Sequence, residues 1–215
     1  MAADVDIVNL ALTKLGSQRI TTLTDNVKAA RSANAIYAIT RDSELRAHQW
    51  NFATKRVILP ALASQPVFGF QLAYELPVDC LKVIQAGDTY PGTPRVLGVV
   101  TETGGNDYQI EGTMIVTNRG TSWLPVVPPA TPPALRLRYT ARITDPNMFD
   151  SSFVEAFAMR LAMDLAEDLT QQIDKRKIAQ EEYKAAIMTA LRANAIELPP
   201  DTLPDNTWLL ARLPG

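Results

Sequence analysis

Hydrophobic positions recur at helical spacing towards both ends of the chain, whereas short β-rich runs fill its middle. The segment from Asp4 to Leu15 predicts a short amphipathic helix, with Asp4 as its cap and Gly16 in the C′ position. A longer helix is predicted from Asp25, a suitable N-cap, to about Trp50, because no Gly or Pro interrupts this run. Small residues lie on more than one face of this helix, so we expect it to pack on two sides. These residues are Ala29, Ala30, Ala33, Ala35 and Ala38.

Strand patterns follow this helix. The run from Lys55 to Leu59 contains the β-branched Val57 and Ile58 and stops before Pro60, which predicts a strand. Residues 135–139 alternate strictly between apolar and polar, which predicts a strand with one wet face. Short strands separated by turn signals are typical of a small antiparallel sandwich or barrel. Besides residues 55–59, the predicted strands are residues 68–76, 80–86, 95–100, 108–111, 113–117 and 135–143. The proline-rich residues 125–133 predict a loop.

Helical spacing returns at Ser152, which opens an S-x-x-E capping box with Glu155. An apolar stripe repeats at every fourth residue after the cap: Phe153, Phe157, Leu161, Leu165 and Leu169. A last helix is predicted from about Asp174. One face of it carries Ala179, Tyr183, Ile187, Ala190 and Asn194. Because Pro199 and Pro200 stop this helix, we expect an extended tail after them.

The order of these elements predicts an α+β fold. We expect an antiparallel helical bundle of two N-terminal and two C-terminal helices, with a small antiparallel β domain inserted between its halves. An extended C-terminal arm completes the chain. The predicted parts are residues 1–52, 53–149, 150–195 and 196–215. Trp50 and Phe52 lie where the helical sequence pattern ends and the strand pattern begins. We therefore predict that they fill the joint between the bundle and the β domain and fix the angle between the two.

Composition narrows the class of protein. The chain has 215 residues, of which 47% are hydrophobic and 20% charged, and this is ordinary globular composition. A net charge of −2 gives no basic field for holding nucleic acid. The lone Cys80 excludes an intramolecular disulfide and is expected to be a buried structural thiol. With no apolar run of about 20 residues and no basic N-terminal region, we expect a soluble protein made in a reducing compartment.

The sequence shows no catalytic constellation. It has no phosphate-binding glycine loop, no CxxC pair and no HExxH motif, and His48 is the only histidine. A Ser-His-Asp triad is not expected, nor is a multi-histidine metal site, so we expect no enzyme, no cofactor and no metal. His48 lies near a helix end, where its imidazole can satisfy backbone carbonyls. Arg136 and Arg138 share one face of an alternating strand, which either is simply solvated or faces DNA.

A resemblance takes the interpretation further. The chain reads IVN at residues 7–9, LG at 15–16, ITTLTD at 20–25, AA at 29–30 and LRAHQWNFA at 45–53. It then reads YELPVDCLKV at 74–83, RY at 138–139 and DPNMF at 145–149, before the helix with Phe153. This ordered set, over about residues 5–195, resembles the tail tubular protein A family of short-tailed bacteriophages, the head-to-tail adaptor or gatekeeper proteins.

The resemblance implies a structural protein of the virion, made in the host cytoplasm. Members of this family form a dodecameric ring beneath the portal protein, with helical parts side by side and β parts facing the distal tail protein, or nozzle. The ring lines a channel for genome retention and ejection. A slightly acidic ring suits passing double-stranded DNA without binding it, because phosphates are repelled. Arg136 and Arg138 are then candidate channel-facing residues.

Two other functions stay open at the level of sequence. One is a connector of a long-tailed phage with the same helical core and a different tail partner. The other is a tail-associated glycan hydrolase, which needs two opposed carboxylates in a cleft. The acids Glu167, Asp168, Glu181 and Glu182 lie on predicted helix surfaces, where solvated charge is the simpler account.

The C-terminal tail is more apolar than a solvated terminus needs to be. It either folds back onto its own bundle or serves as a docking arm for the portal or a neighbouring subunit. We predict the docking arm, with Trp208 as its anchor, because a buried Trp is a frequent hot spot of binding. The apolar residues of this arm are Leu203, Trp208, Leu209 and Leu210.

Overall fold

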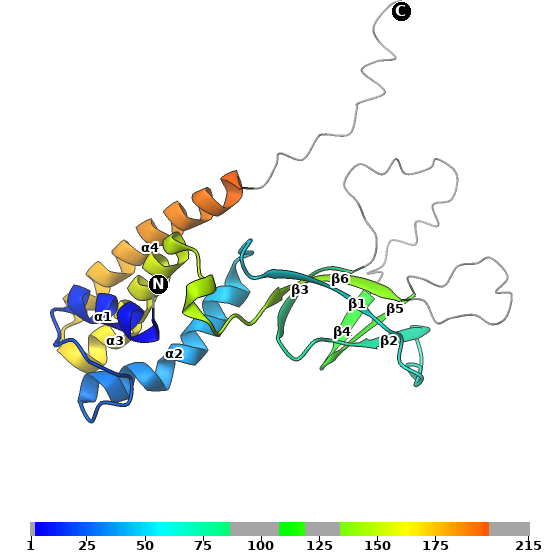
Figure 1. The fold of residues 1–215 in the computed structure, drawn as a ribbon, viewed down its shortest axis with the longest axis horizontal. Coiled ribbons are helices and arrows are strands. Elements are labelled where there is room, and N and C mark those ends of the chain that lie inside the picture. The colour runs from blue at the N-terminus through cyan, green and yellow to red at the C-terminus, as the bar shows by residue number, and fades with distance from the viewer. Residues whose placement is uncertain (1–2, 87–107, 119–133, 198–215) are drawn as a thin grey trace, which may run out of the picture. The chain divides into compact units, whose positions relative to one another are not determined.

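The computed structural model describes residues 3–86, 108–118 and 134–197, and they form a mixed fold of helices and sheets (Figure 1), so the α+β class is confirmed. The helices are α1 (Asp4–Leu15), α2 (Lys28–Ala47), α3 (Ser151–Thr170) and α4 (Ile173–Ile196), with a 3₁₀ turn η1 at Pro146–Met148. The strands are β1 (Thr54–Leu59), β2 (Leu72–Glu75), β3 (Cys80–Ala86), β4 (Tyr108–Glu111), β5 (Met114–Thr117) and β6 (Leu135–Ala141).

Helix α1 ends as predicted and begins with a different cap. Gly16 takes the left-handed conformation at φ 68°, which favours glycine, and its N–H donates to the carbonyl of Thr13. Ala3 occupies the N-cap position, so the prediction that Asp4 caps this helix is wrong. The Asp6 carboxylate instead accepts the Ala3 N–H at 2.9 Å. Asp4 lies inside the first turn, and its carboxylate accepts the hydroxyl of Tyr37 at 2.7 Å.

Helix α2 begins at Lys28, three residues after the predicted cap Asp25. The Asp25 carboxylate accepts both backbone N–H groups of Thr21 and Thr22 and also the Thr22 hydroxyl. These bonds close a tight turn before the helix, so the same oxygens are not left to cap it. On the helix itself, Ala30 and Ala33 are fully buried, but Ala35 and Ala38 are exposed. Of the two sides predicted to pack, only one is therefore buried within the described residues.

Helix α3 packs against each of the other three helices (Figure 1), because its buried side chains lie on more than one face. Besides the predicted stripe, the buried residues are Ala156, Ala158, Met159, Ala162 and Ala166. Phe153, Phe157, Leu161 and Leu165 are all at most 2% exposed, as their spacing predicted, whereas Leu169 at the end of the predicted stripe is only half-buried. The predicted cap at Ser152 is wrong: Asp150 is the N-cap, and its carboxylate accepts the N–H and the hydroxyl of Ser152. Asp150 and Ser152 can each accept the unpaired backbone N–H groups of the first helical turn, and here Asp150 accepts them.

Helix α4 follows α3 after the two residues Gln171 and Gln172, and it begins at Ile173, one residue before the predicted start. Gln171 takes the left-handed conformation at φ 54°, which ends α3 and reverses the chain. The predicted inner face is correct at Ala179, Ile187 and Ala190, which are buried.

The strands form two three-stranded sheets, in the orders β1-β6-β3 and β2-β5-β4. The second sheet is antiparallel: β2 and β4 both pair with β5, and Gly112 at φ 61° helps turn the β4–β5 hairpin. Strand β3 and strand β4 have the predicted bounds, and β6 alternates as predicted up to Tyr139. The predicted strand 68–76 is shorter, because Gly69 at φ 84° interrupts the extended backbone. The predicted strand 95–100 lies outside the described residues.

Contacts within the chain divide it into two compact units. Among the described residues, the helical unit comprises residues 3–55, 79–82 and 139–197. The β unit comprises residues 56–78, 83–86, 108–118 and 134–138. The first residues of β1 and β3 and the last residues of β6 therefore count with the helices. Together with the residues next to them, these short stretches are residues 53–55, 79–82 and 139–142, and we call them the strand roots.

Candidate functional site

An aromatic cluster fills the helical unit where α2 ends and α3 begins. Phe153 lies at its centre, with ring centroids 5.0 Å from Trp50, 5.1 Å from Phe52 and 5.1 Å from Phe149. Phe157 extends the cluster along α3, 5.7 Å from Phe153. The indole N–H of Trp50, which is fully buried, donates to the backbone carbonyl of Glu44 at 3.2 Å. Because a buried indole N–H needs an acceptor, this bond fixes the Trp50 ring at the end of α2.

The three strand roots are held together by backbone and side-chain bonds of the helical unit. The N–H of Ala141 donates to the carbonyl of Ala53 at 2.7 Å, which joins the roots of β6 and β1. The N–H of Arg142 donates to the carbonyl of Asp79 at 2.7 Å, which joins the roots of β6 and β3. Three chain segments that are far apart in sequence therefore leave the helices side by side.

Asp79 is the main electrostatic contact of the strand roots. Its carboxylate accepts the Lys55 ammonium at 2.8 Å and the Tyr139 hydroxyl at 3.0 Å. Burial alone would raise the pKa of Asp79, but the hydrogen bonds from Lys55 and Tyr139 outweigh it and hold the pKa below the ordinary value. Burial and the Asp79 carboxylate together raise the pKa of Tyr139 to about 12, so its hydroxyl stays a donor at neutral pH.

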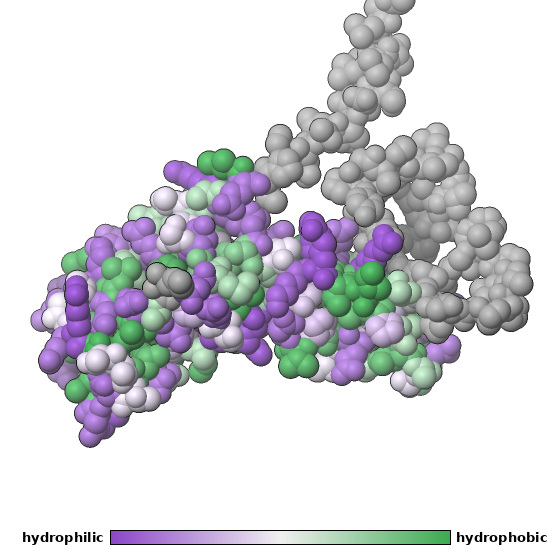
Figure 2. Space-filling view, in the orientation of Figure 1, coloured by the Kyte–Doolittle hydropathy of each residue, from purple (hydrophilic) through white to green (hydrophobic). Residues whose placement is uncertain are grey.

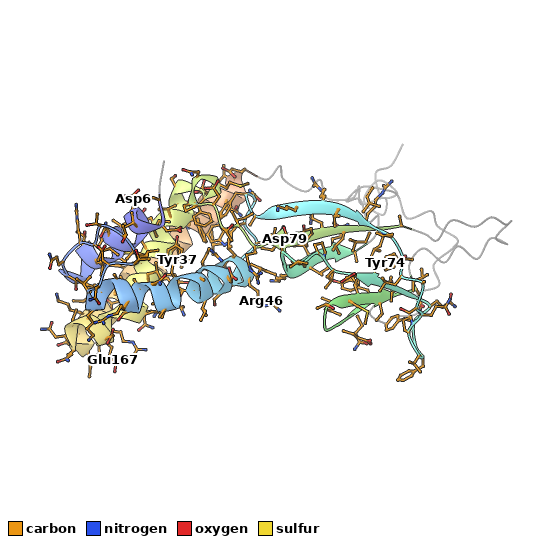
Figure 3. All side chains as sticks on the ribbon, turned by 60° about the horizontal axis from the view of Figure 1, so that its bottom comes forward. Asp6, Tyr37, Arg46, Tyr74, Asp79 and Glu167 are labelled. Carbon is orange, nitrogen blue, oxygen red and sulfur yellow. The ribbon has the colours of Figure 1, made fainter. Side chains whose placement is uncertain are left out.

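Helix α2 holds the same roots through charged side chains. The guanidinium of Arg142 donates to Asp42 at 2.8 Å, and Arg41 donates to the other oxygen of Asp42. Arg46, in the last turn of α2, donates to the carbonyl of Leu81. Figure 3 shows Arg46 at the end of α2 close to Asp79 at the start of β3. The strand roots are thus fixed to the helix by two independent links.

A buried carboxylate, Glu44, lies between α2, α3 and α4. It is 3% exposed, and both of its oxygens accept the hydroxyl of Tyr183 at 3.0 Å. Arg160 lies 3.8 Å away and also pairs with Asp164 at 3.2 Å. Burial raises the pKa of Glu44, and the Tyr183 hydroxyl and Arg160 only partly offset this effect. Because Glu44 is enclosed, a glycan polymer has no access to it, and the Asp164 carboxylate is engaged by Arg160.

The structure places the sequence-predicted site residues as follows. Trp50 and Phe52 lie together in the aromatic cluster, 6.0 Å apart; whether they fix the angle to the β domain stays a prediction. Arg136 is exposed and Arg138 is half-buried on β6, as an alternating strand requires. The docking-arm residues are outside the described residues: Leu203, Trp208, Leu209 and Leu210. Cys80 is half-buried, and burial raises the pKa of its thiol, in keeping with a structural role.

Sequence reasoning missed the two acids that organise the helical unit. Glu44 could have been found, because it continues the 3–4 spacing of Ala33, Tyr37 and Thr40 on the buried face of α2. Asp79 carries a weaker signal, a single acid directly before an apolar strand. Its partners Lys55 and Tyr139 are 24 and 60 residues away in the chain. Pairings at that separation follow from the fold and not from a local pattern.

No family model matches the chain, and no curated protein matches it. Within residues 3–86, 108–118 and 134–197, no group of three or more His, Cys, Asp or Glu side chains is placed to hold a metal ion. No helix in those ranges combines the length and the hydropathy that crossing a membrane requires. A functional proposal therefore depends on the residues and their geometry.

Proposed function

We propose that this chain is a structural virion protein, a head-to-tail adaptor that forms a ring between the portal and the nozzle of a short-tailed phage. One observation carries the proposal. The two ends of the described chain, residues 3–55 and 139–197, belong to one helical unit, and most of the β-strand residues between them belong to another unit. A helical part for the portal side and a β part for the distal tail are what the resemblance to the adaptor family implies.

The detailed architecture that we propose is an antiparallel helical bundle with an inserted β domain and an extended C-terminal arm. In a closed ring, each subunit must meet its neighbour at a fixed rotation, so the subunit itself must be rigid. Within the helical unit, the strand roots are tied to one another and to α2. Asp79 accepts from Lys55 and Tyr139, and Asp42 accepts from Arg142 and from its neighbour Arg41.

The partners that we propose follow from the resemblance to the adaptor family. The helices pack side by side in a ring of twelve copies, the C-terminal arm docks on the portal or on a neighbouring subunit, and the β domain meets the nozzle. Arg136 and Arg138 face the channel. With a net charge of −2, the ring does not bind the passing DNA, and no catalytic step is required of it.

Co-sedimentation with the portal tests this proposal. The portal oligomer of the proposed phage is mixed with the purified 215-residue chain and separated on a density gradient, next to a sample of each protein alone. We expect the chain to move with the portal at a fixed ratio. A chain that remains at the top of the gradient with portal present, while circular dichroism shows it folded, contradicts the proposed function.

A further inference from the structure

Helix α4 carries apolar side chains on two opposite faces. Its inner face packs on α3 through Ala179, Ile187 and Ala190. Away from that face, Ile178 is 58% exposed and Met188 is 53% exposed. Figure 2 shows hydrophobic and hydrophilic surface mixed over the helical unit. A surface helix of a globular protein usually has one apolar stripe, so the second one needs an explanation.

The exposed apolar residues belong to a stripe with regular spacing. We call it the outer stripe of α4, and all of its members are exposed: Ile178, Glu181, Ala185, Met188, Arg192 and Ala195. The steps between neighbours are alternately three and four residues, which is the spacing of a seam between two helices. From end to end the stripe spans about 26 Å at 1.5 Å per residue, long enough for a specific helix pair.

The outer stripe is complementary to itself when it is reversed. If a second α4 runs antiparallel about a two-fold axis between residues 186 and 187, the large Ile178 meets the small Ala195, and Met188 meets Ala185. The remaining pair is Glu181 opposite Arg192, which are of opposite charge. We call each pair of opposing residues a layer, and each of the three layers occurs twice because of the symmetry. A large residue opposite a small one lets two helices approach closely without a void.

The charges also select this orientation. In a parallel pair in the same register, Glu181 would face its own copy and Arg192 would face its own copy, and like charges in contact are destabilising. In the antiparallel pair, the flanking positions bring Lys184 beside Leu191 and Glu182 beside Thr189, so no like charges meet there. Charge and size therefore favour the same arrangement.

We propose that the outer stripe of α4 binds the outer stripe of a second copy of this chain, antiparallel and about a two-fold axis. The surface is isologous: each copy contributes the same residues. A two-fold contact closes after two copies, so it forms a pair and not a ring. The pairing concerns the free chain, covers Ile178 and Met188, and does not rest on the proposed function.

Charge exchange tests the pairing in the full-length chain. Sedimentation velocity over a range of concentrations should show a monomer–dimer equilibrium for the natural sequence. Glu181→Arg places a second guanidinium opposite Arg192 in both symmetric layers and should weaken the dimer about tenfold or more. Arg192→Glu should do the same, because two carboxylates then meet. The double variant E181R/R192E restores opposite charges in both layers and should dimerise again.

The control is Glu155→Arg, which makes the same change of charge at an exposed position of α3. This variant should dimerise like the natural chain. All of these positions are exposed, so circular dichroism should show unchanged folding. The proposal is overturned if the natural chain stays monomeric at every concentration. It is also overturned if Glu181→Arg leaves association unchanged, or if the double variant fails to recover it.

Cysteine pairing tests the register. In a Cys80→Ala background, the variants Ala185→Cys and Met188→Cys are mixed and oxidised. The antiparallel pair predicts a disulfide between the two different variants and much less between identical ones, because residue 185 of one copy lies opposite residue 188 of the other. Preferential bonding of identical variants would show a parallel pair and overturn the proposed arrangement.

Discussion

Replacing Phe153 by alanine should be the most damaging single truncation in the helical unit. Phe153 is 1% exposed, and its ring lies within 5.7 Å, centroid to centroid, of four other aromatic rings. Those rings come from α3 itself, from the segment after α2 and from the segment before α3. Truncation therefore removes a large side chain from a place where three parts of the chain meet, and the surroundings cannot collapse from one side to fill the void.

These contacts determine how much unfolding free energy Phe153→Ala loses. Truncating a buried Phe to Ala costs about 3–5 kcal/mol through lost transfer free energy and the cavity left behind. Each aromatic pair is worth about 0.5–1.5 kcal/mol beyond burial, but four pairs around one ring share atoms and are not additive. We therefore expect a loss at the upper end, about 5 kcal/mol. For a chain of this size, that loss lowers the melting temperature by about 10–20 °C.

Far-ultraviolet circular dichroism during heating follows the helices directly. The matched control is Phe68→Ala, which removes the same side chain at a position that is 87% exposed, and it should change the stability by less than about 0.5 kcal/mol. Phe157→Ala, which removes two ring contacts, should cost about 3–5 kcal/mol. If Phe153→Ala melts within about 2 °C of the natural chain, the aromatic cluster is not the core of this unit.

Three further predictions concern the joint, the strand roots and the arm. Trp50→Ala should lower stability and impair ring assembly together, measured by melting and by co-sedimentation with the portal; a destabilised variant that still assembles normally would refute the proposed role in setting the angle. Asp79→Asn should cost about 1–2 kcal/mol at pH 7 in urea denaturation, from one exposed ion pair and one hydrogen bond. The folded-state pKa of Asp79 is lowered, so its ionised carboxylate stabilises the fold at pH values above the ordinary pKa of 3.8. This stabilisation is lost as the pH falls below 3.8 and through the lowered folded-state pKa, and the stability difference between the two proteins should vanish at such pH values. A difference that persists unchanged at pH values well below this range would contradict this. Deleting residues 199–215 should leave the melting of the helices unchanged and weaken portal attachment, whereas a truncated chain that unfolds would place the arm in its own core.

Periodicity predicted the elements that bury one continuous face. The stripe from Phe153 to Leu165 and the inner face of α4 follow from 3.6-residue spacing, and β6 follows from alternation. These signals are strong because burial acts on every turn of the helix and every second residue of the strand.

The caps were harder to predict because neighbouring side chains compete for the same N–H groups. Asp25 and Ser152 are both good N-caps in isolation. In the structure, Asp25 closes the turn with Thr21 and Thr22, and Asp150 caps α3 in place of Ser152. A single sequence gives no measure of which partner wins such a local competition.

The strand roots and the Glu44 network could not be read from the sequence, since their partners lie far apart along the chain. Tyr183 and Glu44 are 139 residues apart, and Arg142 and Asp42 are 100 residues apart. An acid such as Asp79 looks like any solvated surface acid until the fold brings Lys55 and Tyr139 to it. Only the fold distinguishes these residues from the other acids of the chain.

The most direct test of the adaptor function is electron microscopy of the purified chain with and without the portal protein of the proposed phage. The account predicts a ring of twelve copies stacked coaxially on the portal, with the helical unit against the portal and the β unit pointing away from it. A chain that stays monomeric or paired with portal present would contradict the account, as would binding to the portal without a closed ring.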